Sequence, residues 1–191
     1  MNHAYLPQGV TLAPLAGDFR NALEAAVRAA REVAETAAVA VLAHLGVAEA
    51  EPPPHLDEVQ RLLRRRLRAH GRILGDLRQT SGVQSVQHLV WEMAYEQWHR
   101  MLFARFLAER HLLMWESGVS VTLEECKYMA SESGESLGVR SGWELAGRLA
   151  AKMLPQLLRH DSPVLEVAFA PEHQRALERL LDGLPPEVFL A

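Results

Sequence analysis

Glu96 and His99 are the first pair of residues whose types and spacing could support catalysis. The Glu-x-x-His spacing places a carboxylate and an imidazole on one face of a helix, as in the di-metal sites of helical bundles. His88 and Glu92 lie further back on roughly the same side. Such a site also needs a second Glu-x-x-His and two more glutamates on facing helices, and the sequence contains no second copy. We therefore expect a polar edge beside an apolar face, and no metal ligand.

The single cysteine, Cys126, is the other candidate for covalent chemistry. It lies in the stretch TLEECKYMA beside two glutamates, whose negative charges should raise the pKa of the thiol and disfavour the reactive thiolate. The sequence contains no Gly-x-Ser-x-Gly elbow, no phosphate-binding loop and no Gly-x-Gly-x-x-Gly loop. We therefore predict no catalytic residue, and no enzymatic activity for the chain by itself.

A row of arginines suggests binding of a different kind. Within residues 57–79, seven arginines against three acidic residues give a local charge of +4, although the whole chain has a formal net charge of −4. Five of the guanidiniums share one helical face and could follow DNA phosphates, which would make binding salt-dependent. These candidates for contact with the DNA backbone are Arg61, Arg64, Arg65, Arg68 and Arg72. The alternative is a solvated face, or arginines paired with acids of neighbouring helices such as Glu24, Glu32 and Glu35.

Helical periodicity dominates the chain and would position these residues. Asp57, Thr122 and Ser141 stand where N-caps are expected, and the last two are followed three residues later by the glutamate of a capping box. Gly46 and Gly183 follow predicted helix ends. We predict an all-α protein, an irregular bundle of about six helices around one long, aromatic-rich helix. The predicted helices cover residues 18–45, 57–77, 83–115, 122–131, 141–153 and 171–182.

The longest predicted helix contains the segment WEMAYEQWHRMLFARFLAERHLL, residues 91–113. Apolar residues cover more than half of its circumference, which is typical of a helix buried among several neighbours. Arg100 and Arg105 lie at the margins, where Glu96 and Glu109 stand four residues away and can form ion pairs. We therefore expect this helix to be the central element, with its large apolar residues in the core or at a docking face. Those residues are Trp91, Trp98, Met101, Phe103 and Phe106.

The segment EMAYEQWHRMLFARFLAERHLL resembles a helix in the N-terminal region of large adenine-specific DNA methyltransferases. The relatives are the methylases of the BREX (PglX-like) and DISARM phage-defence systems, in a type IIG-like restriction-modification family. The similarity continues in the same order through VSVTLEECKYMA, WELAGRLAAKMLPQLLRHDSPVLEVAF and LERLLDGLPPEVFLA, and so covers about residues 83–191. The positions that fit the family's helix pattern are Ala94, Tyr95, Trp98, Arg100, Arg105, Phe106 and Glu109.

The resemblance implies transfer of a methyl group from S-adenosylmethionine to the N6 amino group of a flipped adenine. The family uses a Phe-x-Gly-x-Gly-like cofactor loop and an Asn-Pro-Pro-Tyr-like catalytic motif, and this sequence contains neither. Its paired prolines, in EPPPH and LPPEV, lack the flanking Asn or Asp and the aromatic residue. The resemblance therefore implies no catalytic or cofactor-binding residue here, and S-adenosylmethionine is expected only on the catalytic domain of the parent enzyme.

The sequence thus predicts three regions: an N-terminal extension at 1–17, a two-helix segment with a basic second helix at 18–80, and a methyltransferase N-terminal-like helical domain at 81–191. The expected function is that of a fragment, truncated reading frame or split subunit. It would brace a methyltransferase catalytic domain or subunit and contact the backbone of double-stranded DNA.

Two alternatives stay open at this point. One is a free-standing helical module that binds a protein partner and has no role on DNA. The other is a metal-dependent helical-bundle enzyme that uses Glu96 and His99. The single cysteine, the lack of a signal-peptide pattern and the lack of a long apolar run predict a cytoplasmic protein with no membrane partner.

Overall fold

The computed structural model describes residues 15–159 and 161–190. This part of the chain is mostly helical and contains only two short strands, so the predicted all-α class is confirmed. Residues 1–14 of the predicted N-terminal extension lie outside the described residues, and Gly17 already belongs to the first helix. In chain order the elements are α1 (Gly17–His44), α2 (Glu58–Leu74), α3 (Gln87–Glu109), β1 (Met114–Glu116), β2 (Val119–Ser120), α4 (Leu123–Leu137), α5 (Gly142–Met153), the 3-10 helix η1 (Pro163–Leu165), α6 (Pro171–Asp182) and α7 (Glu187–Leu190).

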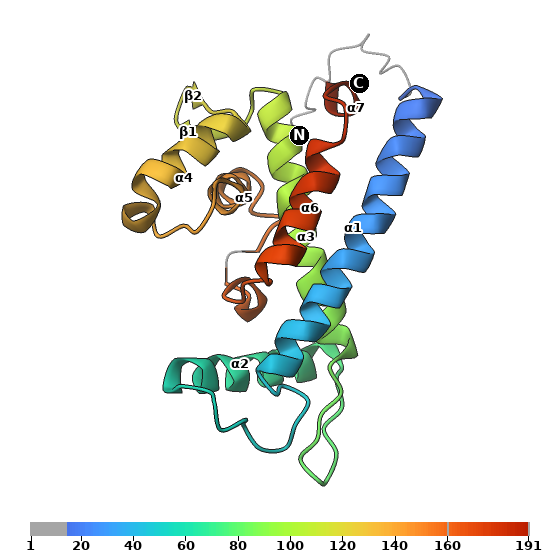
Figure 1. The fold of residues 1–191 in the computed structure, drawn as a ribbon, viewed down its shortest axis with the longest axis vertical. Coiled ribbons are helices and arrows are strands. Elements are labelled where there is room, and N and C mark those ends of the chain that lie inside the picture. The colour runs from blue at the N-terminus through green and yellow to red at the C-terminus, as the bar shows by residue number, and fades with distance from the viewer. Residues whose placement is uncertain (1–14, 160, 191) are drawn as a thin grey trace, which may run out of the picture.

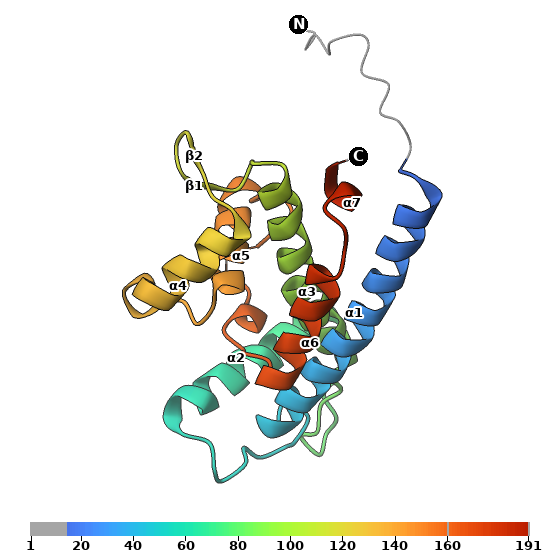
Figure 2. The ribbon, with the colours of Figure 1, turned by 45° about the horizontal axis from the view of Figure 1, so that its top comes forward.

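Helix α3 is the central element, as the sequence predicts. Helices α1 and α5 pack against it, α6 packs against both α1 and α3, and α4 lies outside α5 (Figure 1). Helix α2 crosses below the ends of α1 and α3, and Figure 2 shows the same crossing from another angle. Leu89, Met93 and Trp98 place the core along α3, since all three are almost completely buried.

Small residues explain how α1 approaches its neighbours so closely. Ala30, Ala34, Ala37 and Ala38 are all buried at or below 1 % exposure on the face of α1 that meets the bundle. An alanine adds little bulk at a helix contact, so the two helix axes can come together. Alanine is also the strongest helix former, and both effects favour one long, uninterrupted helix here.

Two of the predicted helix starts have complete capping boxes. At Asp57 the side chain accepts a hydrogen bond from the backbone of Gln60, which in turn accepts one from the Asp57 backbone. Thr122 and Glu125 form the same reciprocal pair, as predicted. At Ser141 only the first half of the predicted box forms, because the Glu144 carboxylate accepts hydrogen bonds from Arg140.

The helix bounds differ most from the prediction at the ends of α3 and α4. Helix α3 ends at Glu109, not at residue 115, because His111 adopts a left-handed conformation (φ 55°) and the chain turns into the short hairpin β1–β2. Helix α4 continues through residues 132–137, which the sequence predicts as a loop. It bends at Ser133 (φ −135°) and stops at Gly138, whose φ of 62° suits a residue without a side chain.

Candidate functional site on helices α2 and α3

The arginine row of α2 contains two buried side chains. Arg64 is 5 % exposed and Arg68 is 7 % exposed. Arg64 donates hydrogen bonds to carbonyl oxygens of the loop at residues 46–50, the closest being that of Glu49 at 2.6 Å. Arg68 donates to the same loop and, at 2.7 Å, to the carbonyl oxygen of Gly82 in the loop that precedes α3. The expectation of five arginines on an open face is therefore wrong at these two positions, which tie two loops to α2.

The other three arginines lie further out. Arg61 donates to the carbonyl oxygen of Leu56 (2.9 Å), and Arg72 donates to the side-chain oxygen of Gln84 (3.0 Å). Arg65 is exposed. These hydrogen bonds end on carbonyl and amide oxygens, so the alternative of ion pairs with acids of α1 does not describe them. The structure therefore keeps only the outer arginines within reach of a ligand.

The two buried guanidiniums lie in an environment that opposes their charge. Burial lowers the pKa of both Arg64 and Arg68, and the positive charges of Arg64, Arg78 and Arg72 lower the pKa of Arg68 further. A guanidinium nevertheless stays protonated in proteins. The carbonyl oxygens that surround each of the two groups must therefore offset this desolvation, and the loops and α2 stabilise one another.

On α3, the residues of the family pattern divide between structure and surface. Ala94, Trp98 and Arg105 are buried. The Nε of Arg105 pairs with Glu109 (2.7 Å), and its Nη1 reaches Asp182 (3.5 Å) at the end of α6. Arg105, predicted at a margin of the apolar surface, thus connects α3 to the C-terminal helices from a buried position.

The predicted pair of Glu96 and Arg100 also forms, with 3.6 Å between the carboxylate oxygen and Nη2. Glu96 is buried in spite of its charge. Burial raises the pKa of its carboxyl, and the nearby Arg100 acts in the opposite direction. Glu96 lies on the core side of α3, and the positive charge of Arg100 offsets part of the cost of burying its carboxylate.

Three aromatic residues of α3 are open to solvent. Trp91 is 46 % exposed and Tyr95 is 51 % exposed, and Phe106 is exposed to a lesser degree. The expectation that α3 is surrounded by neighbours is therefore wrong along this side, since none of the described helices covers it. Exposed tryptophan and tyrosine side chains are typical of docking surfaces.

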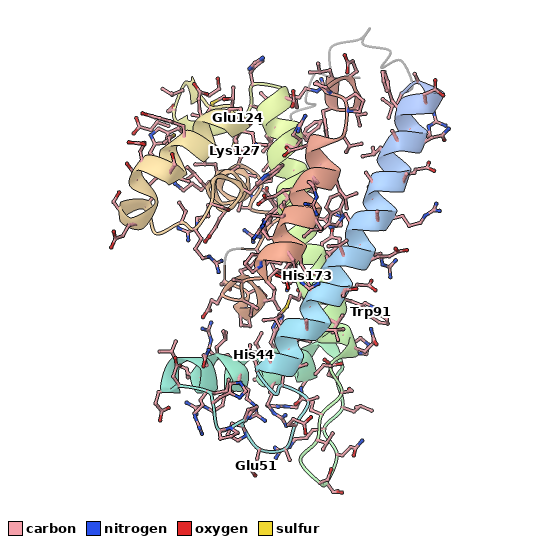
Figure 3. The ribbon with its side chains drawn as sticks, viewed as in Figure 1. His44, Glu51, Trp91, Glu124, Lys127 and His173 are labelled. Atoms are coloured by element: carbon pink, nitrogen blue, oxygen red, sulfur yellow. The ribbon has the colours of Figure 1, made fainter. Side chains whose placement is uncertain are left out.

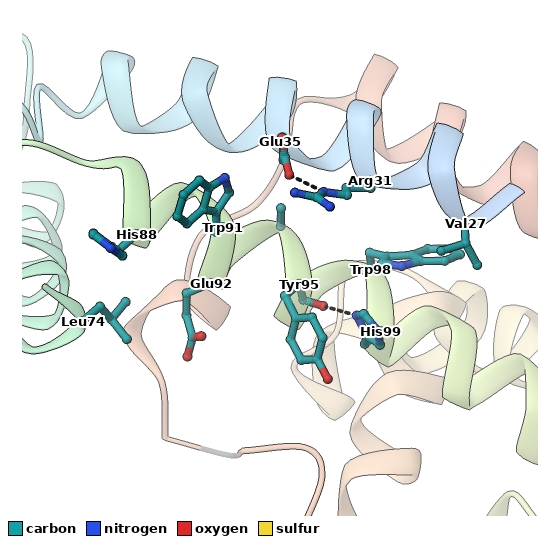
Figure 4. Close-up of a pocket in the computed structure, with 11 residues that line it drawn as sticks. Val27, Arg31, Glu35, Leu74, His88, Trp91, Glu92, Tyr95, Trp98 and His99 are labelled. Atoms are coloured by element: carbon teal, nitrogen blue, oxygen red, sulfur yellow. Dashed lines mark hydrogen bonds and ion pairs between the residues drawn. The ribbon is translucent and has the colours of Figure 1, made fainter. Parts of the chain in front are cut away.

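Trp91 and Tyr95, but not Phe106, line a groove of about 560 Å³ between α1 and α3 and form its floor together with Trp98 (Figure 4). Three residues of the family pattern line it: Ala94, Tyr95 and Trp98. The ring of Tyr95 lies 3.7 Å from that of His99, measured between centroids. Burial lowers the pKa of His99, which favours the neutral, less polar ring at neutral pH. We call this hollow the aromatic groove.

The edges of the aromatic groove are charged. On α1, the Nε of Arg31 pairs with the Glu35 carboxylate at 2.7 Å, and Figure 4 shows this pair beside Trp91 and above Tyr95. On α3, Glu92 lies on the opposite edge, 3.8 Å from Arg159 and 3.9 Å from His70. Trp91 lies on the outside of the bundle near the crossing with α1 (Figure 3). An apolar floor with a charged rim is the usual composition of a protein-binding surface.

A second hollow, of about 790 Å³, lies between α3, α5 and residues 161–174. Three of its arginines are already paired: Arg66 with Glu166 at 2.6 Å, and both Arg140 and Arg148 with Glu144 within 3 Å. Because these charges are neutralised within the chain, the hollow has less to offer an anionic ligand than its arginines suggest.

The side chains of Glu96 and His99 do not converge as the metal-site alternative requires. The Glu96 carboxylate lies toward Arg100, whereas Nδ1 of His99 lies 3.1 Å from the carbonyl oxygen of Tyr95. His88 contacts Asp76 and is drawn away from both. Across residues 15–159 and 161–190, no three His, Cys, Asp or Glu side chains come together in a way that could hold a metal ion.

Cys126 is completely buried on α4, and the structure gives its thiol a pKa of about 11. Burial is the larger cause and the charge of Glu125 is the smaller one, so the sequence prediction had the right direction and named only the second cause. We expect iodoacetamide at about pH 8 to modify the folded chain at least about 100-fold more slowly than the urea-unfolded chain. Mass spectrometry over time measures both rates. Equal rates would show that the thiol is accessible and ionised.

Comparisons with known proteins do not assign this arrangement: no family model matches the chain, and neither a curated protein nor a solved structure does. The resemblance to adenine methyltransferases therefore rests on the sequence motifs alone. In the part of the chain that the structure describes, even the longest helices lack a stretch apolar enough to cross a membrane.

Proposed function

We propose that this chain is the N-terminal helical accessory domain of an N6-adenine-specific DNA methyltransferase of a phage-defence or restriction-modification system. In this proposal its aromatic groove docks the catalytic domain or subunit. One observation carries it: the family-pattern residues Ala94, Tyr95 and Trp98 line a single groove whose aromatic floor is half exposed. A pattern residue that is needed only for the fold has no reason to lie in an open hollow, as Tyr95 does.

The physical argument concerns Trp91 and Tyr95. Large aromatic side chains that remain exposed become favourable only when a partner covers them, and such residues dominate the energy of protein interfaces. The Arg31–Glu35 pair and Glu92 give the groove a polar rim, which would restrict the orientations in which a partner can dock. The proposal therefore assigns to this chain a bracing role, and the chemistry to the partner.

S-adenosylmethionine does not fit the residues described here. In methyltransferases of the resembled family the cofactor loop is glycine-rich, and this sequence has no such loop. The two strands among the described residues form a short antiparallel hairpin and are followed by no glycine-rich turn that could approach a cofactor. No methyl-transfer step is therefore placed on this chain, and the cofactor belongs to the proposed partner.

Contact with the DNA backbone is a secondary part of the proposal, because fewer arginines are available than the sequence predicts. Arg64 and Arg68 are tied to carbonyl oxygens in the interior, which leaves Arg65 and, in part, Arg61 and Arg72 on the outside. Fewer phosphate contacts mean a weaker dependence of binding on salt. DNA contact would therefore assist the catalytic domain without determining the position of this chain.

The test uses the coding sequence downstream of the Ala191 codon, read first for an Asn-Pro-Pro-Tyr motif. The chain and that catalytic region are then produced as separate polypeptides in one cell. We expect the double substitution Trp91→Ser and Tyr95→Ser to abolish co-purification and to lower N6-methyladenine formation at least about tenfold. Tyr128→Ser, an equally polar change of an exposed aromatic residue on α4, is the matched control and should change neither.

Two results would count against the proposal. The catalytic region could methylate DNA equally well without the chain, or the groove variant could co-purify as the unaltered chain does. Circular dichroism of each variant separates a lost contact from a lost fold. If the chain captures no catalytic region but still binds a protein through the groove, the free-standing interaction module becomes the better description.

A further inference from the structure

The outer face of α2 carries an aliphatic stripe that no described element covers. Val59 is 76 % exposed and Ile73 is 81 % exposed, and Leu62 and Ala69 are exposed between them. Together with Arg66, these residues form what we call the α2 seam. The usual distribution of polar and apolar side chains is thus partly reversed on α2. Two arginines point inward to backbone carbonyl oxygens, while branched aliphatic side chains point to solvent. Such exposed stripes are typical of interaction sites.

The spacing of the α2 seam is that of a coiled coil. Its residues stand at positions 59, 62, 66, 69 and 73, separated by alternating steps of three and four. A helix with this repeat keeps its apolar residues facing one partner helix along its whole length. Arg66 occupies a seam position, and its guanidinium turns aside to Glu166 at 2.6 Å, so the apolar residues on either side remain accessible.

The charges beside the seam are mostly basic. Glu58, Arg65 and Arg72 occupy the three positions that flank the seam on one side, each one heptad apart, and both arginines are exposed. In a coiled coil these flanking positions select a partner of opposite charge. Glu58, at the start of α2, is the only acidic residue of that helix.

We infer that α2 pairs in coiled-coil fashion with an amphipathic helix of a partner protein, whose aliphatic seam is bordered by acidic residues. A second copy of this chain is a poor occupant, because Arg66 would face Arg66 in a parallel pair and Arg65 would face Arg65 or Arg72 of the other copy in an antiparallel pair. The inference is independent of the proposed docking of the catalytic domain, since it concerns a different helix face from the aromatic groove. It competes with the proposed DNA contact, which uses the same Arg65 and Arg72.

The test uses two synthetic peptides of about 21 residues, three heptads, each with leucine at the seam positions. One carries glutamate and the other lysine at the flanking positions. Like charges keep each peptide from pairing with itself at neutral pH. Fluorescence anisotropy with the labelled peptide and the full chain should show at least about tenfold tighter binding of the glutamate peptide.

Variants of α2 then locate the contact. We expect the double substitution Leu62→Ser and Ile73→Ser to weaken binding of the glutamate peptide at least about tenfold. Val39→Ser, at an exposed aliphatic residue of α1, is the matched control and should leave binding unchanged. Arg65→Glu should reduce or reverse the preference for the glutamate peptide, and Arg28→Glu on α1 should not.

Equal affinity for the two peptides, or insensitivity to the seam variants, would overturn the inference. So would a salt-dependent affinity for a DNA duplex that Arg65→Glu removes and the seam variants leave unchanged, because the surface would then bind DNA. The groove variants Trp91→Ser and Tyr95→Ser should bind the glutamate peptide as the unaltered chain does. A failed peptide test therefore leaves the proposed docking of the catalytic domain untouched, and the reverse also holds.

Discussion

Replacing Arg68 with methionine is expected to lower the free energy of unfolding by about 3–5 kcal/mol. The guanidinium donates to carbonyl oxygens in two separate loops, at Val47 and Glu49 before α2 and at Gly82 after it. Methionine retains most of the aliphatic length but no donor, so the carbonyl oxygens of Val47 and Gly82 would be left without a partner, while that of Glu49 keeps its hydrogen bond from Arg64. Each unsatisfied group costs about 1–3 kcal/mol, which makes the total large for a single substitution.

Arg65→Met is the matched control, because it makes the same chemical change on the same helix at an exposed position. Its effect should remain within about 0.5 kcal/mol. Urea unfolding followed by circular dichroism, with linear extrapolation to water, measures both. Arg68→Lys should fall between the two, since one ammonium group cannot reach both loops in the geometry of the planar guanidinium.

A small loss of stability in Arg68→Met, together with a large loss of DNA affinity, would contradict this assignment. It would show that the guanidinium is available to phosphates and that the contacts to the loops contribute little. Stability and binding must therefore be measured on the same variants.

The arginines of α2 show what sequence periodicity can and cannot predict. The spacing correctly places Arg64, Arg68 and their neighbours on one side of a helix, but the same spacing does not say whether that side faces solvent. Carbonyl oxygens of the loops at residues 46–50 and 82–84 decide the matter, and no residue type marks a backbone acceptor in the sequence. The local pattern of residues therefore predicts that α2 is a helix, whereas tertiary contacts determine which of its faces is buried.

The same division explains the aromatic groove and the capping residues. Helix α3 and its two internal ion pairs follow from local spacing, and both pairs are present. The exposure of Trp91 and Tyr95 depends on where α1 and α6 stop covering α3, which composition does not specify. Thr122 could be recognised as a cap because its partner Glu125 lies three residues away, while the cap of α3 lies more than ten residues from the helix it serves.

That distant cap is Asp76, and replacing it with alanine is expected to lower the free energy of unfolding by about 3–4 kcal/mol. Val86, at the N-cap position of α3, has no side-chain acceptor. The buried Asp76 carboxylate takes its place: Oδ1 accepts from the backbone of His88 (3.0 Å) and Oδ2 from that of Leu89 (3.2 Å). Its negative charge also lies at the positive end of the α3 dipole. Alanine removes both acceptors at once from the start of the central helix.

Asp57→Ala provides the comparison, because Asp57 caps α2 from an exposed position and its loss should cost only about 1 kcal/mol. Unfolding in urea measures the total effect, and amide hydrogen exchange at His88 and Leu89 locates it, since both amides should exchange faster in Asp76→Ala. Equal losses in the two variants would show that α3 does not depend on this carboxylate.

Gly71 tests the same contact from the opposite side. A Cβ at this position would lie 2.9 Å from the Asp76 Oδ2 and 3.2 Å from the Gln84 amide nitrogen, so Gly71→Ala must displace the carboxylate that caps α3. If Gly71→Ala acts by displacing this cap, it should lower the free energy of unfolding of the unaltered chain. Its effect should be clearly smaller in the Asp76→Ala background. Additive losses would mean that alanine at position 71 acts on something other than the cap. A loss of stability in the double variant that is smaller than the sum of the two single losses would show the opposite. The Asp76 carboxylate would then couple the inner face of α2 to the first turn of α3, the helix that carries the aromatic groove.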